Sequence, residues 1–107
     1  MSTRTKLFLS AIVVILFIVE AGCSKQGTDT SALYIPTAAD ATATATLQEL
    51  QQGRALYVDY CGKCHGFYNP DAFSPTQWRN VMTSMAPKTS MTAGEVNLVT
   101  KYVTRGN

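Results

Sequence analysis

Apolar residues recur with a helical period in three segments after residue 45. The clearest stripe follows the i, i+3, i+4, i+7 spacing of one helix face and consists of Trp78, Val81, Met82 and Met85. Each segment opens with a capping box, in which a Ser or Thr is answered three positions later by Glu or Gln. The boxes begin at Thr46, Ser74 and Thr92. No segment alternates apolar and polar residues as a strand does, so we predict an all-α domain over residues 46–107.

The start of the chain has the pattern of an export signal. Arg4 and Lys6 precede an apolar run over residues 7–19, and Ala21-Gly22-Cys23 follows. A membrane-spanning helix needs roughly 20 apolar residues, so this run is short for an anchor. We therefore expect the rest of the protein to be exported, on the periplasmic side of a bacterial membrane.

Ala21-Gly22-Cys23 also resembles the lipobox of bacterial lipoproteins. The resemblance implies that residues 1–22 are a signal peptide and that Cys23 is acylated and anchors the mature chain to a membrane. Glu20 stands where that family usually has an apolar residue. Ordinary cleavage and an uncleaved anchor therefore remain alternatives.

Residues 23–45 are rich in Ser, Thr and Ala and carry no helical stripe. Such a composition buries too little apolar surface to offset the entropy of ordering the chain. We predict a flexible tether here. Its only apolar patch, Leu33-Tyr34-Ile35, is a candidate for packing back onto the domain.

Composition limits the possible functions. The 107 residues allow one small domain, and the net charge of +2 without a basic stripe argues against a nucleic-acid partner. A folded part of about sixty residues has a thin core, and domains of that size are marginal without a disulfide, a metal or a cofactor.

The sequence Cys61-Gly62-Lys63-Cys64-His65 carries the candidate chemistry. C-x-x-C-H is the signature of covalent haem attachment, in which two thiols add to the haem vinyl groups and the adjacent imidazole reaches the iron. A Cys61–Cys64 redox disulfide of thioredoxin type would need a βαβ context. Structural zinc would need further Cys or His ligands, and only Cys23 is left. We predict one covalent haem c, held by Cys61 and Cys64 with His65 as the proximal axial ligand.

Residues 53–102 resemble the small monohaem class I c-type cytochromes. Gly53-x-x-Leu56-Tyr57-x-x-x-Cys61 is similar to the family's N-terminal helix, and residues 65–70 resemble the loop in which a Pro carbonyl orients the proximal imidazole. The resemblance implies a class I cytochrome c-like fold of three main short helices around the haem. It also implies that the first and last helices cross, with the small Gly53 admitting an aromatic residue such as Tyr102.

The sixth iron ligand is predicted to be a methionine, because a thioether raises the haem potential for electron transfer. Met85 ends the second helix just before Ala86-Pro87, and it matches the Met that follows Trp by seven in similar cytochromes. Met82 and Met91 are interpreted as packing residues and remain the alternatives. Three tyrosines, Tyr57, Tyr60 and Tyr68, are expected to form walls of the haem pocket. Arg54 and Arg79 are candidates for binding the haem propionates. Trp78 is expected either to pack against the haem, to donate a hydrogen bond to a propionate or to be a plain core residue.

A His–Met haem has no open position for a substrate, and the chain offers no second His for acid–base work. We predict a one-electron carrier rather than an enzyme, without a small-molecule substrate, whose redox partners are membrane reductases, oxidases or reaction-centre complexes. A haem-based sensor of small gases with a labile Met85 is the alternative. A haem-free lipoprotein with a redox disulfide and a subunit fixed in a larger electron-transfer complex are two further hypotheses.

Overall fold

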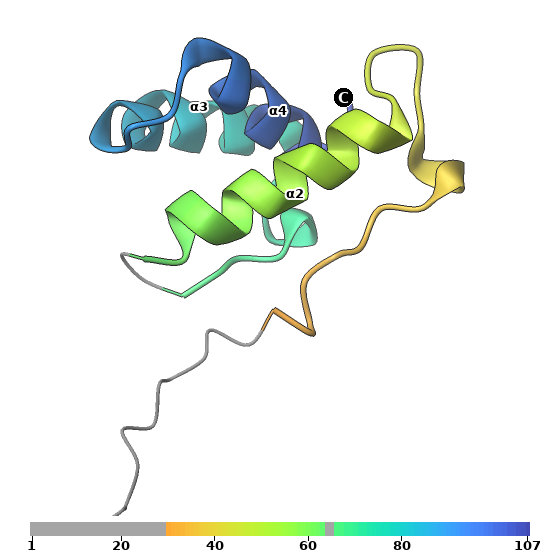
Figure 1. The fold of residues 1–107 in the computed structure, drawn as a ribbon, viewed down its shortest axis with the longest axis horizontal. Helices are drawn as coiled ribbons and strands as arrows, with labels where there is room; N and C mark the ends of the chain where they lie inside the picture. Colours follow the sequence, from red (N-terminus) through yellow and green to blue (C-terminus); the bar gives the residue numbers. More distant parts are fainter. Residues whose placement is uncertain (1–29, 64–65) are drawn as a thin grey trace, which may run out of the picture.

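The computed structural model describes residues 30–63 and 66–107 of the chain. Its helices are α2 (Leu47–Cys61), α3 (Pro75–Met85) and α4 (Ala93–Val103), with the short 3-10 turns η1 (Ala38–Asp40), η2 (Pro70–Ala72) and η3 (Ala86–Lys88), as Figure 1 shows. No strand occurs in these two ranges, which confirms the predicted all-α fold. None of the helices described is long and apolar enough to cross a membrane. The predictions for residues 1–22, Cys23, Cys64 and His65 lie outside the described residues.

All three predicted capping boxes are present. The side chains of Thr46, Ser74 and Thr92 each accept a hydrogen bond from the backbone N–H three residues later, at 3.2, 3.3 and 3.3 Å. In return, the Glu or Gln side chain accepts from the cap residue's own N–H at 2.9, 2.9 and 2.7 Å. These reciprocal bonds satisfy donors that a helix start leaves unpaired, which is why the helices begin where the sequence indicates.

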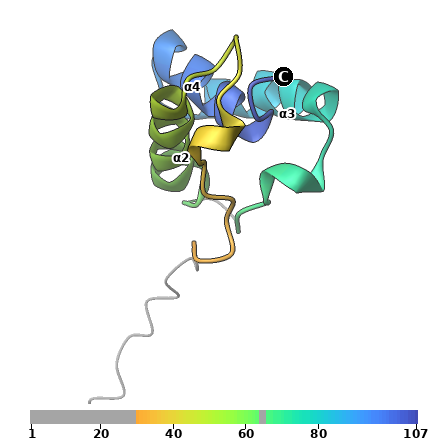
Figure 2. The same cartoon turned by 90° about the vertical axis from the view of Figure 1, so that its right-hand side faces the viewer.

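Helices α2 and α4 cross in close contact at Gly53 (Figures 1 and 2). A Cβ atom at residue 53 would lie 2.1 Å from the carbonyl oxygen of Leu98 and 2.8 Å from the Cβ of Tyr102. Only glycine leaves room for this approach. The crossing that the resemblance implied, with Tyr102 set against Gly53, is therefore confirmed.

The core is built from the apolar faces of the three helices and one residue that precedes them. Met82, although part of the Met-bearing stripe, is 6% exposed and belongs to this core. The main core cluster consists of Leu33, Tyr57, Trp78, Met82, Val99, Tyr102 and Val103.

Residues 30–45, here called the strap, lie against the helices. Leu33 is only 5% exposed, and the ring of Tyr34 stacks on that of Tyr102 with centroids 5.8 Å apart. Ile35 points away and is 63% exposed. Two residues of the apolar patch thus pack onto the domain and the third does not.

Hydrogen bonds to main-chain carbonyls hold the first part of the strap. Arg54 donates from Nη2 to the oxygen of Thr30 and from Nε to that of Tyr34, each at 3.2 Å. The Asn69 side-chain amide donates to Ala32 at 2.8 Å, and the Tyr102 hydroxyl donates to Tyr34 at 2.8 Å. Over residues 30–45 this differs from the tether expected for residues 23–45, whose first part, residues 23–29, lies outside the described residues. The holding side chains come from distant helices, so the strap's own composition carries no sign of them.

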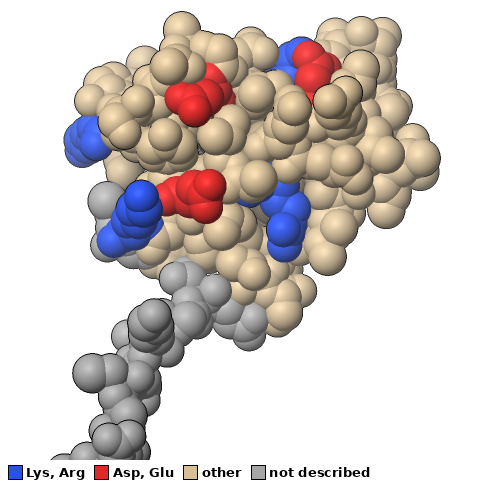
Figure 3. All heavy atoms as spheres, viewed as in Figure 1, with Lys and Arg blue, Asp and Glu red and all other residues tan. Residues whose placement is uncertain are grey.

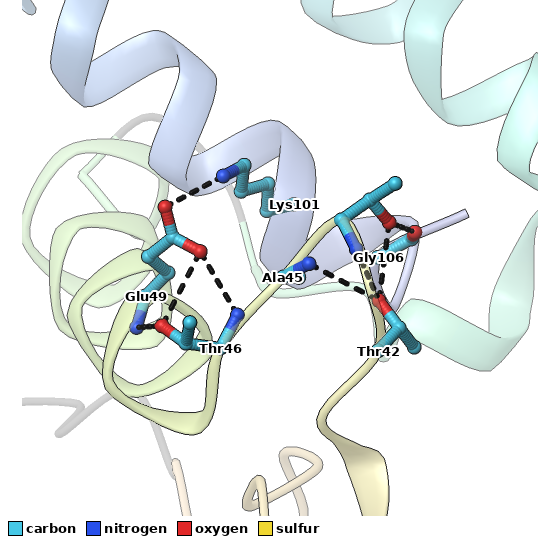
Figure 4. A network of polar contacts seen from close by, with 7 residues as sticks. Thr42, Ala45, Thr46, Glu49, Lys101 and Gly106 are labelled. Atoms are coloured by element: carbon cyan, nitrogen blue, oxygen red, sulfur yellow. Dashed lines mark hydrogen bonds and ion pairs between the residues drawn. The ribbon is translucent and has the colours of Figure 1, made fainter.

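Polar contacts fasten the other end of the strap (Figure 4). Glu49 accepts from the backbone N–H of Thr46 at 2.9 Å and from Nζ of Lys101 at 2.6 Å. The Thr44 hydroxyl donates to the carbonyl of Gly106. The end of the strap, the start of α2 and the end of α4 are thereby joined.

Candidate haem site

An apolar cavity of about 480 Å³ lies among the C-terminal half of α2, residues 66–73 and α3. This volume is within the usual range for small-molecule and cofactor sites. The three tyrosines predicted as pocket walls, Tyr57, Tyr60 and Tyr68, all line it. Its other apolar lining residues are Cys61, Phe73, Trp78, Val81, Met82 and Met85.

The residues that line the cavity include the first residue of the Cys61–His65 motif and the residue that follows the motif. Cys61 is the last residue of α2 and is half-buried, and Gly66 follows the motif directly. At Gly62 a Cβ atom would lie 2.2 Å from the tip of the Phe67 ring. The loop after the motif therefore folds back over the motif's second position, and glycine is what gives that ring its space.

Tyr57 holds the loop that follows the motif. Its hydroxyl donates to the carbonyl of Tyr68 at 2.8 Å and accepts from the N–H of the same residue at 3.1 Å. Burial raises the pKa of Tyr57 to about 12. The hydroxyl therefore stays protonated near neutral pH and can keep both bonds.

Trp78 ties α3 to the same loop. Its ring is 2% exposed, and Nε1 donates to the carbonyl of Pro70 at 2.8 Å. Because an indole has a single N–H, the propionate bond considered for Trp78 is wrong. The ring instead serves as cavity wall and core, in edge contact with Phe73 and Tyr57 at centroid distances of 5.1 and 6.2 Å.

The three candidate methionines occupy different environments. Met85 is half-buried and lines the cavity as the last residue of α3. Met82 lines it too but lies within the core, as the packing interpretation expects. Met91 packs against the edge of the core and is not among the cavity-lining residues that the structure describes.

The two arginines considered for the propionates are held elsewhere. Arg54 is bonded to strap carbonyls, and Arg79 donates from Nη2 to the carbonyl of Asn107 at 2.5 Å. Neither is among the described residues that line the cavity, so the structure gives no support to either assignment. The cation that the structure places in the lining is Lys88, and no acidic residue accompanies it among the described lining residues. Sequence reasoning missed Lys88, although its position three residues after Met85 was a usable signal.

The chemistry of these walls fits a haem. Aromatic and aliphatic side chains suit the apolar macrocycle, and a thiol at the edge of the cavity suits thioether attachment at Cys61. Met85 supplies a soft sulfur ligand of the kind that axial haem sites use. Lys88 supplies a positive charge in a cavity that would take up a group bearing carboxylates.

Comparison with known proteins points in the same direction. No protein-family model matches the chain, and no solved structure matches it. Over 63 residues the chain is 36% identical to the cytochrome c-type protein TorY of Haemophilus influenzae. That stretch is 58% of this chain and 17% of the relative, so the chain spans about a sixth of that protein's length. The similarity supports a c-type cytochrome.

Proposed function

We propose that this protein is a one-electron carrier built on a single covalent haem c. The observation that carries the proposal is the apolar cavity with Cys61 at its edge and Met85 in its wall. Cys61 and Cys64 would hold the haem through thioethers, with His65 and Met85 as axial ligands. When bound, the haem supplies an iron centre that cycles between two oxidation states one electron apart.

The chain's own residues set the surroundings of that centre. The rings of Tyr57, Phe73 and Trp78 line the cavity and would shield a bound haem from water, and a dry apolar shell raises the potential of an iron site. The hydrogen bonds from Tyr57 to Tyr68 and from Trp78 to Pro70 fix the loop after the motif. A fixed site is what a carrier needs, since little then moves when the charge on the iron changes.

Carbon monoxide separates the carrier from the alternative, a small-gas sensor with a labile Met85. A reduced carrier with both axial positions filled resists carbon monoxide at neutral pH, and a sensor takes it up readily. The half-buried position of Met85, at the end of a helix whose neighbouring stripe residue Met82 is in the core, favours the closed site.

We further propose that residues 1–22 direct export and that Cys23 is acylated on the periplasmic side of a membrane. With the strap packed on the helices, the tether shortens to residues 23–29. The described acidic and basic side chains are interspersed on the face that Figure 3 shows, and two of the acids, Glu49 and Asp71, are paired with Lys101 and Arg105. Membrane-bound redox proteins are the proposed partners, and a strongly charged docking field is not expected.

The chain expressed with a haem c maturation system tests the assignment. Haem that stays with the protein through acid–acetone extraction, and a mass equal to chain plus one haem, support the carrier. Cys61→Ala should weaken this retention, whereas Thr89→Ala, at another cavity wall, should leave it intact. A haem-free chain with a Cys61–Cys64 disulfide would overturn the proposal and favour a thiol redox protein.

A further inference from the structure

Two large hydrophobic side chains remain exposed in the described part of the chain, and both lie near the point where the strap begins. Ile35 is 63% exposed and Tyr68 is 54% exposed. Asn69, next to Tyr68, donates to the carbonyl of Ala32 at 2.8 Å. Ile35 follows Ala32 by three residues, a reach of about 10 Å at full extension. The two exposed side chains therefore belong to one end of the molecule.

The described part of the chain begins at this same end. Thr30, the first described residue, is held to Arg54 through its carbonyl oxygen. In both Figure 1 and Figure 2 the start of the strap and the loop after the haem motif occupy the same side of the helices. The other end of the strap, at Thr44, is fixed beside Gly106 at the far end of α4.

The length of the remaining tether limits where the domain can lie. Seven peptide links separate Cys23 from Thr30, so they span at most about 25 Å. A tether running to residue 45 would have reached about 75 Å. The short span is close to the length of α2, whose 15 residues extend about 22 Å. A domain anchored at Cys23 thus stays within about its own diameter of the lipid.

We propose that Ile35 and Tyr68 form a surface that rests on the lipid bilayer when Cys23 is anchored. This inference rests on the anchorage in the proposed function. Removing the isoleucine side chain from water is favourable in free energy. Tyrosine suits a membrane–water interface because its ring is apolar and its hydroxyl is polar. We assign the bilayer as the partner of this surface because the proposed lipid anchor, Cys23, lies only seven peptide links before Thr30.

Contact between this surface and the bilayer would also bring the haem cavity close to the membrane. Tyr68 lines the cavity and is exposed at the same time, so the cavity rim at Tyr68 comes close to the bilayer. Electron exchange would then take place beside the lipid surface. This fits partners embedded in the membrane with their own cofactor near that surface, and it disfavours a domain that shuttles over long distances.

The test uses the mature chain on nanodiscs of phosphatidylethanolamine and phosphatidylglycerol that contain a gadolinium-chelating lipid. Ile35 is the single isoleucine after residue 22, so isoleucine methyl labelling reports on this surface alone. Leu47, just beyond the opposite end of the strap, serves as the reference in a second sample that is labelled at leucine methyl groups. We expect the gadolinium lipid to abolish the Ile35 methyl signal while Leu47 keeps most of its intensity. Equal loss at both, or greater loss at Leu47, would overturn the proposal.

A matched pair of variants distinguishes surface docking from a simple tethering effect. Ala32 and Ala93 are both exposed, the first on the strap and the second at the start of α4. Ala32→Glu should restore much of the Ile35 signal, because a carboxylate resists approach to the anionic lipid, and Ala93→Glu should leave the loss unchanged. If the loss of the Ile35 methyl signal were the same with and without Ala32→Glu, docking by this surface would be contradicted.

The anchorage is tested separately by the mass of the mature protein. A chain without acyl groups on Cys23 would overturn the lipid-anchor part of the proposed function. The surface is then measured on the same nanodiscs with Cys23 coupled to a maleimide lipid, so the two proposals fail independently.

Discussion

The indole Nε1 of Trp78 and the carbonyl oxygen of Pro70 are joined by a 2.8 Å hydrogen bond. This bond connects α3, which ends at the proposed ligand Met85, with the loop that follows the Cys61–His65 motif. Since Trp78 is buried, the carbonyl has little access to water when the indole is removed. The Trp78–Pro70 hydrogen bond therefore fixes two walls of the haem cavity with respect to one another.

Replacing Trp78 by Phe tests this connection. Loss of the bond should lower the free energy of unfolding by about 1–3 kcal/mol, because a buried acceptor loses its partner. It should also shift the reduction potential, since the cavity walls can then move. Tyr102→Phe is the control, because it removes a comparable bond to the Tyr34 carbonyl in the strap. Urea unfolding and spectroelectrochemistry should show a stability loss in both variants and a potential shift in Trp78→Phe only.

The helix crossing predicts opposite outcomes for two glycines. Gly53→Ala places a Cβ 2.1 Å from the Leu98 oxygen and should destabilise the fold by about 1–3 kcal/mol or more through overpacking. Gly94 is also helical, and a Cβ atom there would have no neighbour nearer than 4.0 Å, so Gly94→Ala should stabilise by up to about 1 kcal/mol. Equal stabilities of the two variants in urea would contradict the close crossing.

The strap predicts different costs at two nearby apolar residues. Leu33→Ala empties a buried site and should cost about 2–5 kcal/mol. Ile35→Ala changes an exposed side chain and should stay within about 0.5 kcal/mol. Thermal unfolding of the water-soluble chain without its anchor measures both. A Leu33→Ala protein as stable as the wild type would contradict the packing of residues 30–45 on the helices and support a flexible tether instead.

The Glu49–Lys101 pair predicts a pH dependence. Hydrogen bonds from Lys101 and Thr46 lower the pKa of Glu49 below its ordinary value of 4.5. The stabilisation is therefore present above about pH 4.5 and is lost as the pH falls through the lowered pKa. Glu49→Gln keeps the capping acceptor and loses the charge, so its Tm should lie below that of the wild type at neutral pH and converge with it in acid.

Glu95→Gln is the matched control for this prediction. The Glu95 carboxylate accepts a 2.7 Å hydrogen bond from the backbone N–H of Thr92, as Glu49 does from Thr46. Within residues 30–63 and 66–107, however, no lysine contact is described for Glu95. Its substitution should change Tm little between neutral and acidic pH. A pH profile shared by both glutamine variants would show that capping, rather than the ion pair, causes the effect.

The elements were predictable because their signals are local. A capping box spans four residues, and the stripe at Trp78, Val81, Met82 and Met85 lies on one helix, so both can be read without knowledge of the fold. The strap was not predictable in full, since Arg54, Asn69 and Tyr102 hold it through main-chain carbonyls. Every residue has such a carbonyl, and sequence does not show which of them will find a donor.

The site was predictable in type and less so in detail. The Cys61–His65 spacing indicates haem by itself, and the tyrosine walls followed from their places near the motif. The propionate assignments found no support, because a long arginine side chain can reach in several directions, and those of Arg54 and Arg79 reach main-chain carbonyls. Met82 and Met85 share one helix face, so both border the cavity, and the stripe alone does not separate them.

Near-infrared absorption of the ferric protein reports directly on the proposed bond between Met85 and the haem iron. A thioether on ferric haem iron gives a weak band there, and this band should be present in the wild type, in Met82→Leu and in Met91→Leu. Met85→Ala should abolish the band and open the reduced protein to carbon monoxide. A band that survives Met85→Ala, or a wild-type protein with covalent haem and no band, would contradict the His65–Met85 carrier.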